Sequence, residues 1–403
     1  MAVCILVLAS CGGGSGGSPS PAAPSPPAGV SDTSDAPLSP DFYDLPADWA
    51  VTPVEMQSCD VASLRDVENV YSETASKFFT WLTGTVEQAH YEPIGEVANY
   101  FGFAALRNEI RENFGDGADE GYRGAASREV LELLDFSQRA LMYDLLNEHR
   151  DAINGFLADR ALLVDELWAL KSNRRLDLDR VIELMLSIGE YEGQVTVITA
   201  QKYAEIMATL TSDQLQYLED MRTLDVSISD MNGTVLMPYG PAANEEYDAL
   251  DSADAELMTE VTSKLVSWAT GTLEDSIYLP TGKIANFFGF ASYRYLDRAG
   301  VSRGQAAGFV DGVMTSGQQA VLCGLSTNVV DYTNDYIEGR EILITRLDIL
   351  KANPFLPIVD YHTDYANLAG VGEGRRAVVE ALTFHLIESM MSNEQLQELG
   401  SLR

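Results

Sequence analysis

The sequence predicts an all-α protein that contains two homologous helical units in tandem, each built on a helical hairpin or bundle. Three observations lead to this fold class. Apolar residues such as Leu141, Leu145 and Ile153 recur four or eight residues apart, which places them on one face of a helix. Strict alternation of apolar and polar residues, which is typical of strands, is nowhere sustained. A 32-residue segment is present twice, and a helix-start pattern recurs at matched positions in both halves.

The first residues are typical of an export signal. Residues 1–10 form a short, mostly apolar segment, and a hydrophobic residue and two small residues stand directly before Cys11. This pattern resembles the lipobox of bacterial lipoproteins, in which the cysteine is acylated and the preceding signal peptide is removed. The resemblance implies lipid attachment at Cys11. Because Gly12 follows, rather than an Asp, we expect anchoring to the outer membrane, in the periplasm or at the cell surface.

The signal is followed by a tether. Residues 11–40 are rich in Gly, Ser and Pro, a composition typical of a flexible and then stiffer linker. No later stretch reaches the ~20 apolar residues that a membrane span needs. We therefore expect membrane contact through the N-terminal lipid only.

The chain is strongly acidic and poor in metal-binding residue types. Lys and Arg number 26 against 61 Asp and Glu, which gives a formal net charge of −35. Such a charge repels phosphate backbones, so nucleic acid is excluded as a partner. Four Cys and four scattered His predict no metal site. Cys59 and Cys323 either form a disulfide or remain as two buried thiols.

An internal duplication organises the body of the chain. Residues 76–107 and 263–294 align without a gap at an offset of 187 (263 − 76), and 17 of the 32 positions are identical. The match continues more weakly at an offset of 180, where residues 171–173 fall on residues 351–353. The chain is therefore expected to contain two copies of one unit.

These copies define the predicted domain organisation. The first helical unit spans residues 41–222 and the second spans residues 251–403. Residues 223–250 contain several Gly, Pro and Asn, which interrupt helices, and are predicted to form the linker between the units.

Four pentads share a helix-start pattern: an apolar residue, an N-cap residue, two further residues and Gln. This is the pattern of a capping box, in which the N-cap oxygen accepts from the amide three residues later and the Gln side chain accepts from the N-cap amide. Each unit contains two pentads at nearly equal separation. The predicted pairs are Asp135 and Gln138, Thr211 and Gln214, Thr315 and Gln318, and Ser392 and Gln395.

The paired pentads resemble the LTxxQ motifs of the Spy/CpxP family of periplasmic stress chaperones. Residues 210–214 fit the motif fully, and the other three pentads depart at one or two positions. The resemblance covers roughly residues 130–222 and 310–403. It implies a small helical hairpin that pairs antiparallel into a curved cradle for unfolded client proteins. The duplication would then supply both halves in one chain, as a pseudo-dimer.

The repeated 32-residue segment offers a second candidate site. Pro93 and Pro280 suit the first turn of a helix, and aromatic, Asn and Arg residues are predicted to lie along it on nearly one face. These residues either line twin pockets for an anionic or amide-bearing ligand or form the docking face by which this aromatic helix packs on the neighbouring hairpin, with the Arg paired with a carboxylate. They are Trp81, Asn99, Phe103 and Arg107 in the first copy and Trp268, Asn286, Phe290 and Arg294 in the second.

No motif identifies a reaction or a cofactor, so we expect a protein that is not an enzyme. The leading hypothesis is a lipid-anchored envelope protein that binds unfolded or partner proteins, as a Spy/CpxP-like stress chaperone. One alternative is a structural or assembly lipoprotein that docks another envelope protein. The other is a small-ligand sensor that uses the twin aromatic pockets.

Overall fold

The structure, a computed structural model, contains helices as its only regular secondary structure in the described residues. It describes residues 70–92, 94–98, 120–223, 241–277, 279, 284–288, 303–358 and 361–402, all within one compact unit that spans residues 38–403. Helices make up 84% of it and no strand occurs in the described ranges, which confirms the all-α prediction. No described helix is long and apolar enough to cross a membrane. Six predicted site residues lie outside the described ranges: Cys11, Asn99, Phe103, Arg107, Phe290 and Arg294.

The first half begins with short helices and continues with two long ones. Its elements are α1 (Val70–Thr83), α2 (Val86–His90), the 3₁₀ turn η4 (Ile94–Glu96), α4 (Glu120–Leu133), α5 (Phe136–Trp168), the 3₁₀ turn η5 (Ala169–Ser172), α6 (Leu178–Met207) and α7 (Ser212–Thr223).

The second half follows a similar order after one additional helix, α9 (Pro241–Asp248), but three elements, α15, η8 and α16, stand where the first half has the single helix α6. Like α5, α14 has 33 residues, and it begins 180 positions later (316 − 136). The elements are α10 (Ser252–Thr270), α11 (Leu273–Ile277), α13 (Arg303–Val313), α14 (Ser316–Asp348), the 3₁₀ turn η7 (Ile349–Lys351), α15 (Tyr361–Ala366), the π-helix η8 (Asn367–Glu373), α16 (Gly374–Ser389) and α17 (Asn393–Ser401).

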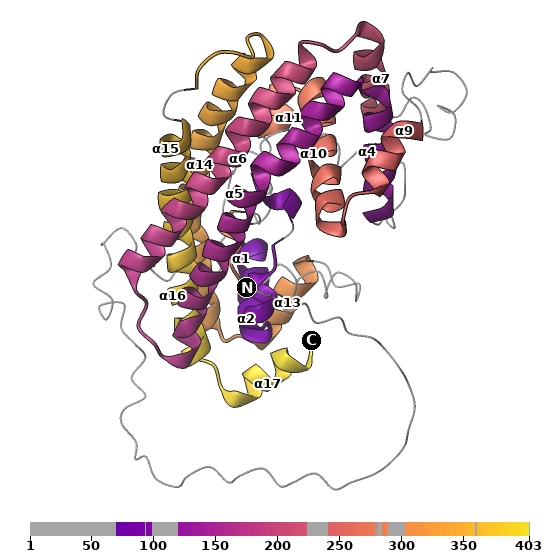
Figure 1. The fold of residues 1–403 in the computed structure, drawn as a ribbon. Coiled ribbons are helices and arrows are strands. Elements are labelled where there is room, and N and C mark those ends of the chain that lie inside the picture. Colours follow the sequence, from indigo (N-terminus) through magenta and orange to yellow (C-terminus); the bar gives the residue numbers. More distant parts are fainter. Residues whose placement is uncertain are drawn as a thin grey trace, which may run out of the picture. The chain divides into compact units, whose positions relative to one another are not determined.

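Each half contains a long antiparallel hairpin. α5 packs along α6, and α14 packs along η8 and α16 (Figure 1). The first hairpin turns at Asn173, whose φ of 54° is the left-handed conformation that Asn tolerates at helix ends. α6 then begins at the N-cap Asp177, whose side chain accepts from the amide of Arg180.

The first helix of each half packs on the other half. α1 lies mainly against α13, α14 and α17, whereas α10 lies mainly against α4, α5 and α7. Within their own halves, α2 contacts α5 and α11 contacts α14. Each of these two helices therefore has its main contacts with helices from the other half of the sequence.

The two hairpins meet where α6 crosses α15 and η8, and glycines allow the close approach. A Cβ atom at Gly189 would lie 2.9 Å from the Cα of Ala366, and one at Gly370 would lie 2.9 Å from the Cα of Leu186. Gly189 and Gly370 are 181 positions apart, so both halves contribute a glycine at equivalent places. The backbones touch at this crossing, with no room for a side chain between them.

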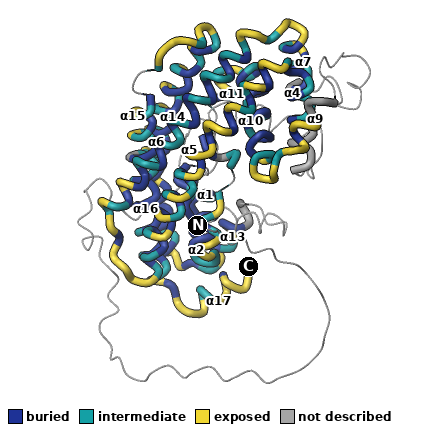
Figure 2. Tube along the Cα trace, viewed as in Figure 1, coloured by how far each residue is buried: buried dark blue, intermediate teal, exposed yellow. Residues whose placement is uncertain are grey.

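A continuous apolar core runs along the inner faces of the helices, where the tube in Figure 2 is dark blue. Cys323 on α14 is fully buried in this core and is disulfide-bonded. Cys59, which the sequence offers as its partner, lies outside the described residues. For Cys323 the disulfide alternative therefore holds, rather than the buried thiol.

One local prediction is wrong. The sequence predicts a helix that begins at Pro93 and continues through Ala98, with an equivalent helix after Pro280. Ala98 and Ala285 instead have φ values of 53° and 54°, in the left-handed region that interrupts a right-handed helix. The reason is tertiary: both alanine amides donate to partly buried glutamates of other helical elements, which are described below.

Candidate functional site

All four predicted capping boxes are formed, and in each half the two boxes interlock. In the first half, Gln138 Oε1 accepts from the amide of Asp135 (2.8 Å) and from Gln214 Nε2 (2.9 Å). Gln214 Oε1 accepts from the amide of Thr211 at 2.9 Å, and its Nε2 also donates to the carbonyl of Leu133, the last residue of α4, at 2.8 Å. Gln138 Nε2 donates to the carbonyl of Thr209 after α6 at 3.1 Å.

The second half repeats this arrangement. Gln318 Oε1 accepts from the amide of Thr315 (2.8 Å) and from Gln395 Nε2 (3.0 Å). Gln395 Oε1 accepts from the amide of Ser392, and its Nε2 donates to the carbonyl of Val313 at the end of α13. The Gln side chains thus bond to free amides at two helix starts and to free carbonyls at two helix ends, and they hold the helices together at the open end of each hairpin.

Two further capping boxes were not predicted. Thr85 and Gln88 cap α2, and Thr272 and Asp275 make the same reciprocal bonds at the start of α11. Thr followed three residues later by Gln or Asp was a visible signal in the repeated segment. The short helices of that segment therefore begin by the same local mechanism as the long ones.

The two tryptophans of the second candidate site lie in different parts of the core. Trp81 is fully buried against Trp168, Phe288 and Phe384, with ring centroids 5.4–6.3 Å apart. Trp268 is buried against Tyr203 at 6.4 Å. The structure does not bring the two tryptophans together, and aromatic neighbours surround Trp81 on several sides.

Equivalent lysines cover the two tryptophans. The Nζ of Lys171 lies 5.2 Å from the Trp81 ring, and that of Lys351, 180 positions later, lies 5.0 Å from the Trp268 ring. Asn286 is only partly buried, and its carbonyl accepts from Arg160 at 2.8 Å. A ligand-binding role for Trp81, Trp268 and Asn286 stays a prediction.

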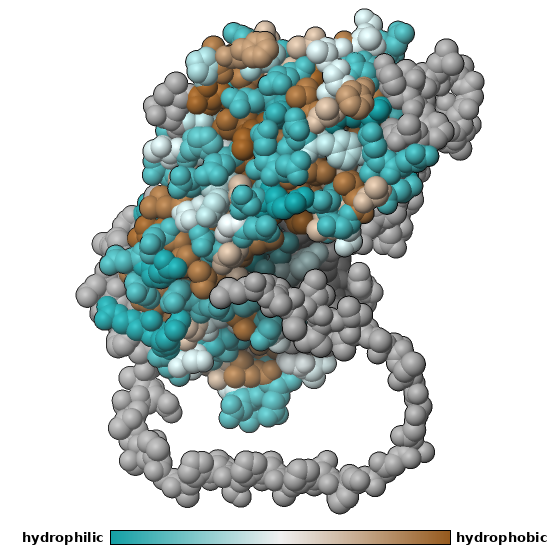
Figure 3. Space-filling model, viewed as in Figure 1, coloured by the Kyte–Doolittle hydropathy of each residue, from teal (hydrophilic) through white to brown (hydrophobic). Residues whose placement is uncertain are grey.

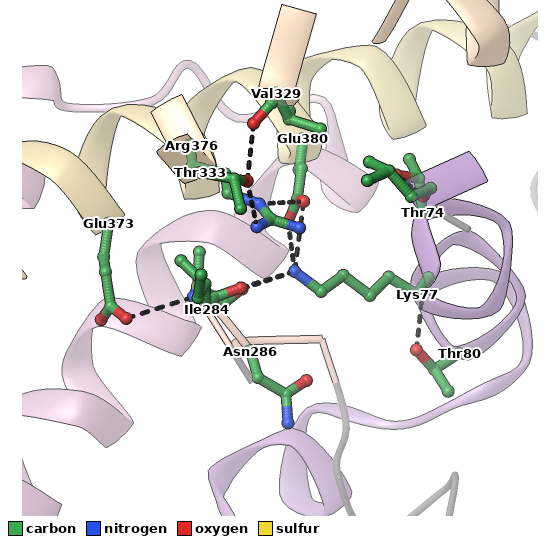
Figure 4. A network of polar contacts seen from close by, with 12 residues as sticks. Thr74, Lys77, Thr80, Ile284, Asn286, Val329, Thr333, Glu373, Arg376 and Glu380 are labelled. Carbon is green, nitrogen blue, oxygen red and sulfur yellow. Dashed lines mark hydrogen bonds and ion pairs between the residues drawn. The ribbon is translucent and has the colours of Figure 1, made fainter. Parts of the chain in front are cut away.

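The most unusual site is a buried charged cluster between the halves, which the sequence did not predict. Lys77 of α1 reaches Glu380 of α16 at 3.1 Å and the carbonyl of Ile284 at 2.8 Å (Figure 4). Arg376 pairs with the same Glu380 at 2.8 Å and donates to the hydroxyl of Thr333. Because charges are buried only when paired, this network fixes helix α1 on the second half.

The central arginines of the two long helices hold equivalent backbone segments. Arg160 on α5 donates to the carbonyl of Ala89 at 2.7 Å, and its guanidinium pairs with Glu92 at 2.9 Å. Arg340 on α14 donates to the carbonyl of Ser276 at 2.7 Å, at the end of α11. Both arginines are buried, so each places positive charge at a helix C-terminus inside the protein.

A pair of glutamates completes the cluster. Glu192 on α6 accepts from the amide of Ala98 at 3.4 Å, and Glu373 at the end of η8 accepts from the amide of Ala285 at 3.5 Å. Burial is the main reason that the pKa of Glu192 rises to about 8 and that of Glu373 to about 7, and their mutual repulsion also raises the pKa of Glu192. Both residues keep some solvent-accessible surface, so water moderates these shifts.

Apolar side chains are also exposed. On the face seen in Figure 3 they are scattered among hydrophilic ones. A concentrated series occupies the last turns of α14 and the loop that follows, where Ile342 is 63% exposed, Ile349 50%, Phe355 83% and Leu356 37%. The corresponding positions of the first half include Leu162, 45% exposed, but Arg175 replaces Phe355.

No group of three or more His, Cys, Asp or Glu side chains that could hold a metal occurs among the described residues. Comparisons with known protein families, curated proteins and solved structures found no match to this chain.

Proposed function

We propose that this chain is a lipid-anchored envelope protein that binds unfolded polypeptides through exposed apolar side chains, in the manner of a Spy/CpxP-like chaperone. Acylation at Cys11 would hold it at the outer membrane by the tether. The disulfide at Cys323 is consistent with an oxidising compartment such as the periplasm.

The architecture supports this proposal. We infer that the two halves are duplicated hairpin units that pair as a pseudo-dimer within one chain. The similar element order, the packing of α1 and α10 each on the other half, and the interlocked Gln pairs of both halves favour this inference. An antiparallel pair of such hairpins is the arrangement that the resemblance to the Spy/CpxP family implies.

The observation that carries the proposal is the exposed series Ile342, Ile349, Phe355 and Leu356. Ile342 and Ile349 are seven residues apart and share one face of α14 and η7. Leaving such residues in water is unfavourable, by ~25 cal/mol for each Å² of apolar surface. A binding partner that covered them would recover this free energy, and unfolded chains offer apolar segments that can do so.

The test is an aggregation assay. The body of the protein, residues 41–403, should delay the aggregation of a chemically denatured model enzyme when present at equal or lower molar amounts. Replacing Ile342, Ile349 and Phe355 together by Ser should abolish most of the delay. Leu162→Ser, at the position equivalent to Ile342, is the matched control and should keep it.

Measuring the delay at low and at high salt separates the apolar contribution to client binding from the electrostatic one. Exposed charges are screened at high ionic strength, whereas apolar contacts persist. The delay should therefore survive high salt. Absence of a delay at both low and high salt, with a body that unfolds cooperatively, would rule the proposal out.

A second candidate is a docking module for one envelope protein. It is favoured by the asymmetry of the apolar series, since Arg175 in the first half stands where the second half has Phe355. Docking predicts no effect on the aggregation of unrelated enzymes. It also predicts one specific cross-linked partner in envelope extracts, which the triple Ser variant should lose and Leu162→Ser should keep.

A further inference from the structure

The proposed function does not use the two glutamates at the crossing of the hairpins. Glu192 directly precedes Gly193 on α6, and Glu373 directly precedes Gly374 on α16. The pairs are 181 positions apart, so both halves place a carboxylate at equivalent points. A Cβ atom at Gly193 would lie 3.1 Å from the Cβ of Tyr365, and one at Gly374 would lie 2.9 Å from Met185 Cγ. A negative charge on either glutamate therefore lies beside a tightly packed contact between helices.

The backbone around the pair is strained in the same way on both sides. Each carboxylate accepts from the amide of an alanine in the left-handed conformation, Ala98 for Glu192 and Ala285 for Glu373. An alanine keeps this conformation only where its surroundings enforce it. Glu373 also ends a π-helix, an irregularity that is frequent at functional sites.

Groups from all the packed elements face the two carboxylates. Negative charge comes from Glu92, and the buried phenols of Tyr336 and Tyr365 are close enough for Glu373 to raise their pKa. Five positive groups also interact with the glutamates: three of them lower the pKa of Glu192 or Glu373, while burial lowers the pKa of the other two, Arg160 and Arg340, and the negative charge of a glutamate partly offsets this lowering. They are Lys77 of α1, Lys264 of α10, Arg160 of α5, Arg340 of α14 and Arg376 of α16.

We propose that Glu192 and Glu373 form a proton-binding site through which pH controls the packing of α6 against η8. With at least one carboxyl protonated, the crossing is closed. Loss of the protons leaves two negative charges in a poorly hydrated contact, and the crossing loosens. The residual solvent accessibility of both glutamates gives protons a route to the site.

The sign of the effect follows from the direction of the shifts. Both glutamates have a folded-state pKa above the ordinary value of 4.5. The closed state therefore binds more protons than the open state, and its stability falls as pH rises through about 7 and 8. Between roughly pH 6.5 and 8.5 we expect the equilibrium constant for closing the crossing to fall by about 10- to 100-fold.

Amide hydrogen exchange of the unacylated full-length chain tests the proposal. After correction for intrinsic exchange rates, residues 186–193 and 366–374 should lose about 10- to 100-fold of their protection over this pH range. The double variant Glu192→Gln plus Glu373→Gln mimics the protonated pair and should show a flat profile. Glu129→Gln is the control: Glu129 lies on α4, away from the crossing, and its pKa is also raised, to about 7, mainly by burial, while Tyr217 of α7 donates to it. It should leave the wild-type profile of the crossing unchanged.

Infrared spectroscopy in D₂O gives a second measurement that does not depend on the folding of the double variant. The Glu129→Gln protein, which lacks the other glutamate whose pKa is raised to about 7, should show at pH 7 a protonated carboxyl C=O band that disappears as pH rises above 8. An absent band, or equal exchange profiles in wild type and the double variant, would overturn the proposal.

Discussion

The interlocked Gln pair of the first half should contribute far more to stability than an ordinary helix cap. Replacing Gln138 by Ala removes its bonds to the amide of Asp135, to the carbonyl of Thr209 and to Gln214. Gln138 is buried, so water does not replace these partners. At about 0.5–1.5 kcal/mol for each hydrogen bond, three lost bonds amount to ~1.5–4.5 kcal/mol of unfolding free energy.

A double-mutant cycle measured by urea unfolding tests the link between the two boxes. Gln214→Ala should cost a similar ~1.5–4.5 kcal/mol of unfolding free energy. The double variant should cost less than the sum of the two single variants by about 1 kcal/mol or more, since the shared bond is lost only once. The control is Gln216→Ala on the same helix, an exposed side chain that should change stability by less than ~0.5 kcal/mol. Additive single effects of ~1 kcal/mol each would refute the interlocked pair and leave two independent caps.

Two further predictions use the same assay. Gly189→Ala should destabilise the protein by ~1–3 kcal/mol, because its Cβ would meet the backbone of Ala366. The control is Gly312→Ala, whose Cβ would meet no packed neighbour within 4 Å and which should stabilise the protein by ~0.5–1 kcal/mol. Equal effects of the two substitutions would argue against the tight crossing. Lys77→Met should cost ~3–5 kcal/mol, because it leaves Glu380 without one buried partner, while Lys202→Met, at the more exposed pair with Glu148, should cost under ~1 kcal/mol. A loss below 1 kcal/mol at Lys77 would contradict the role assigned to the buried network.

The helix starts could be predicted because a capping box is a local interaction within four residues. Its N-cap, its Gln and its spacing are all visible in the sequence, and the four predicted boxes are present. The Gln–Gln contact could not be predicted in the same way. It joins residues 76 positions apart (214 − 138), and only the hairpin geometry brings them together.

The packing of α1 and α10 each on the other half also has no local signal, since an amphipathic helix does not specify which half it covers. Identity between the copies was the available clue to the buried cluster. Lys77 and Lys264 stand 187 positions apart, and Arg160 and Arg340 stand 180 apart. Identical charged residues at equivalent places are a signal that could have pointed to this cluster. Tertiary contacts, rather than helix propensity, then place Ala98 in the left-handed region.

Fragment complementation tests most directly whether α1 and α10 are each held by helices from the other half of the chain. A fragment ending in the 224–240 segment contains α1 without its main partners, and the remaining fragment contains α10 without its own. Neither fragment alone should unfold cooperatively, whereas mixing them should give a 1:1 complex with a single cooperative transition. Two fragments that each fold alone and do not associate would contradict the packing of each helix on the other half.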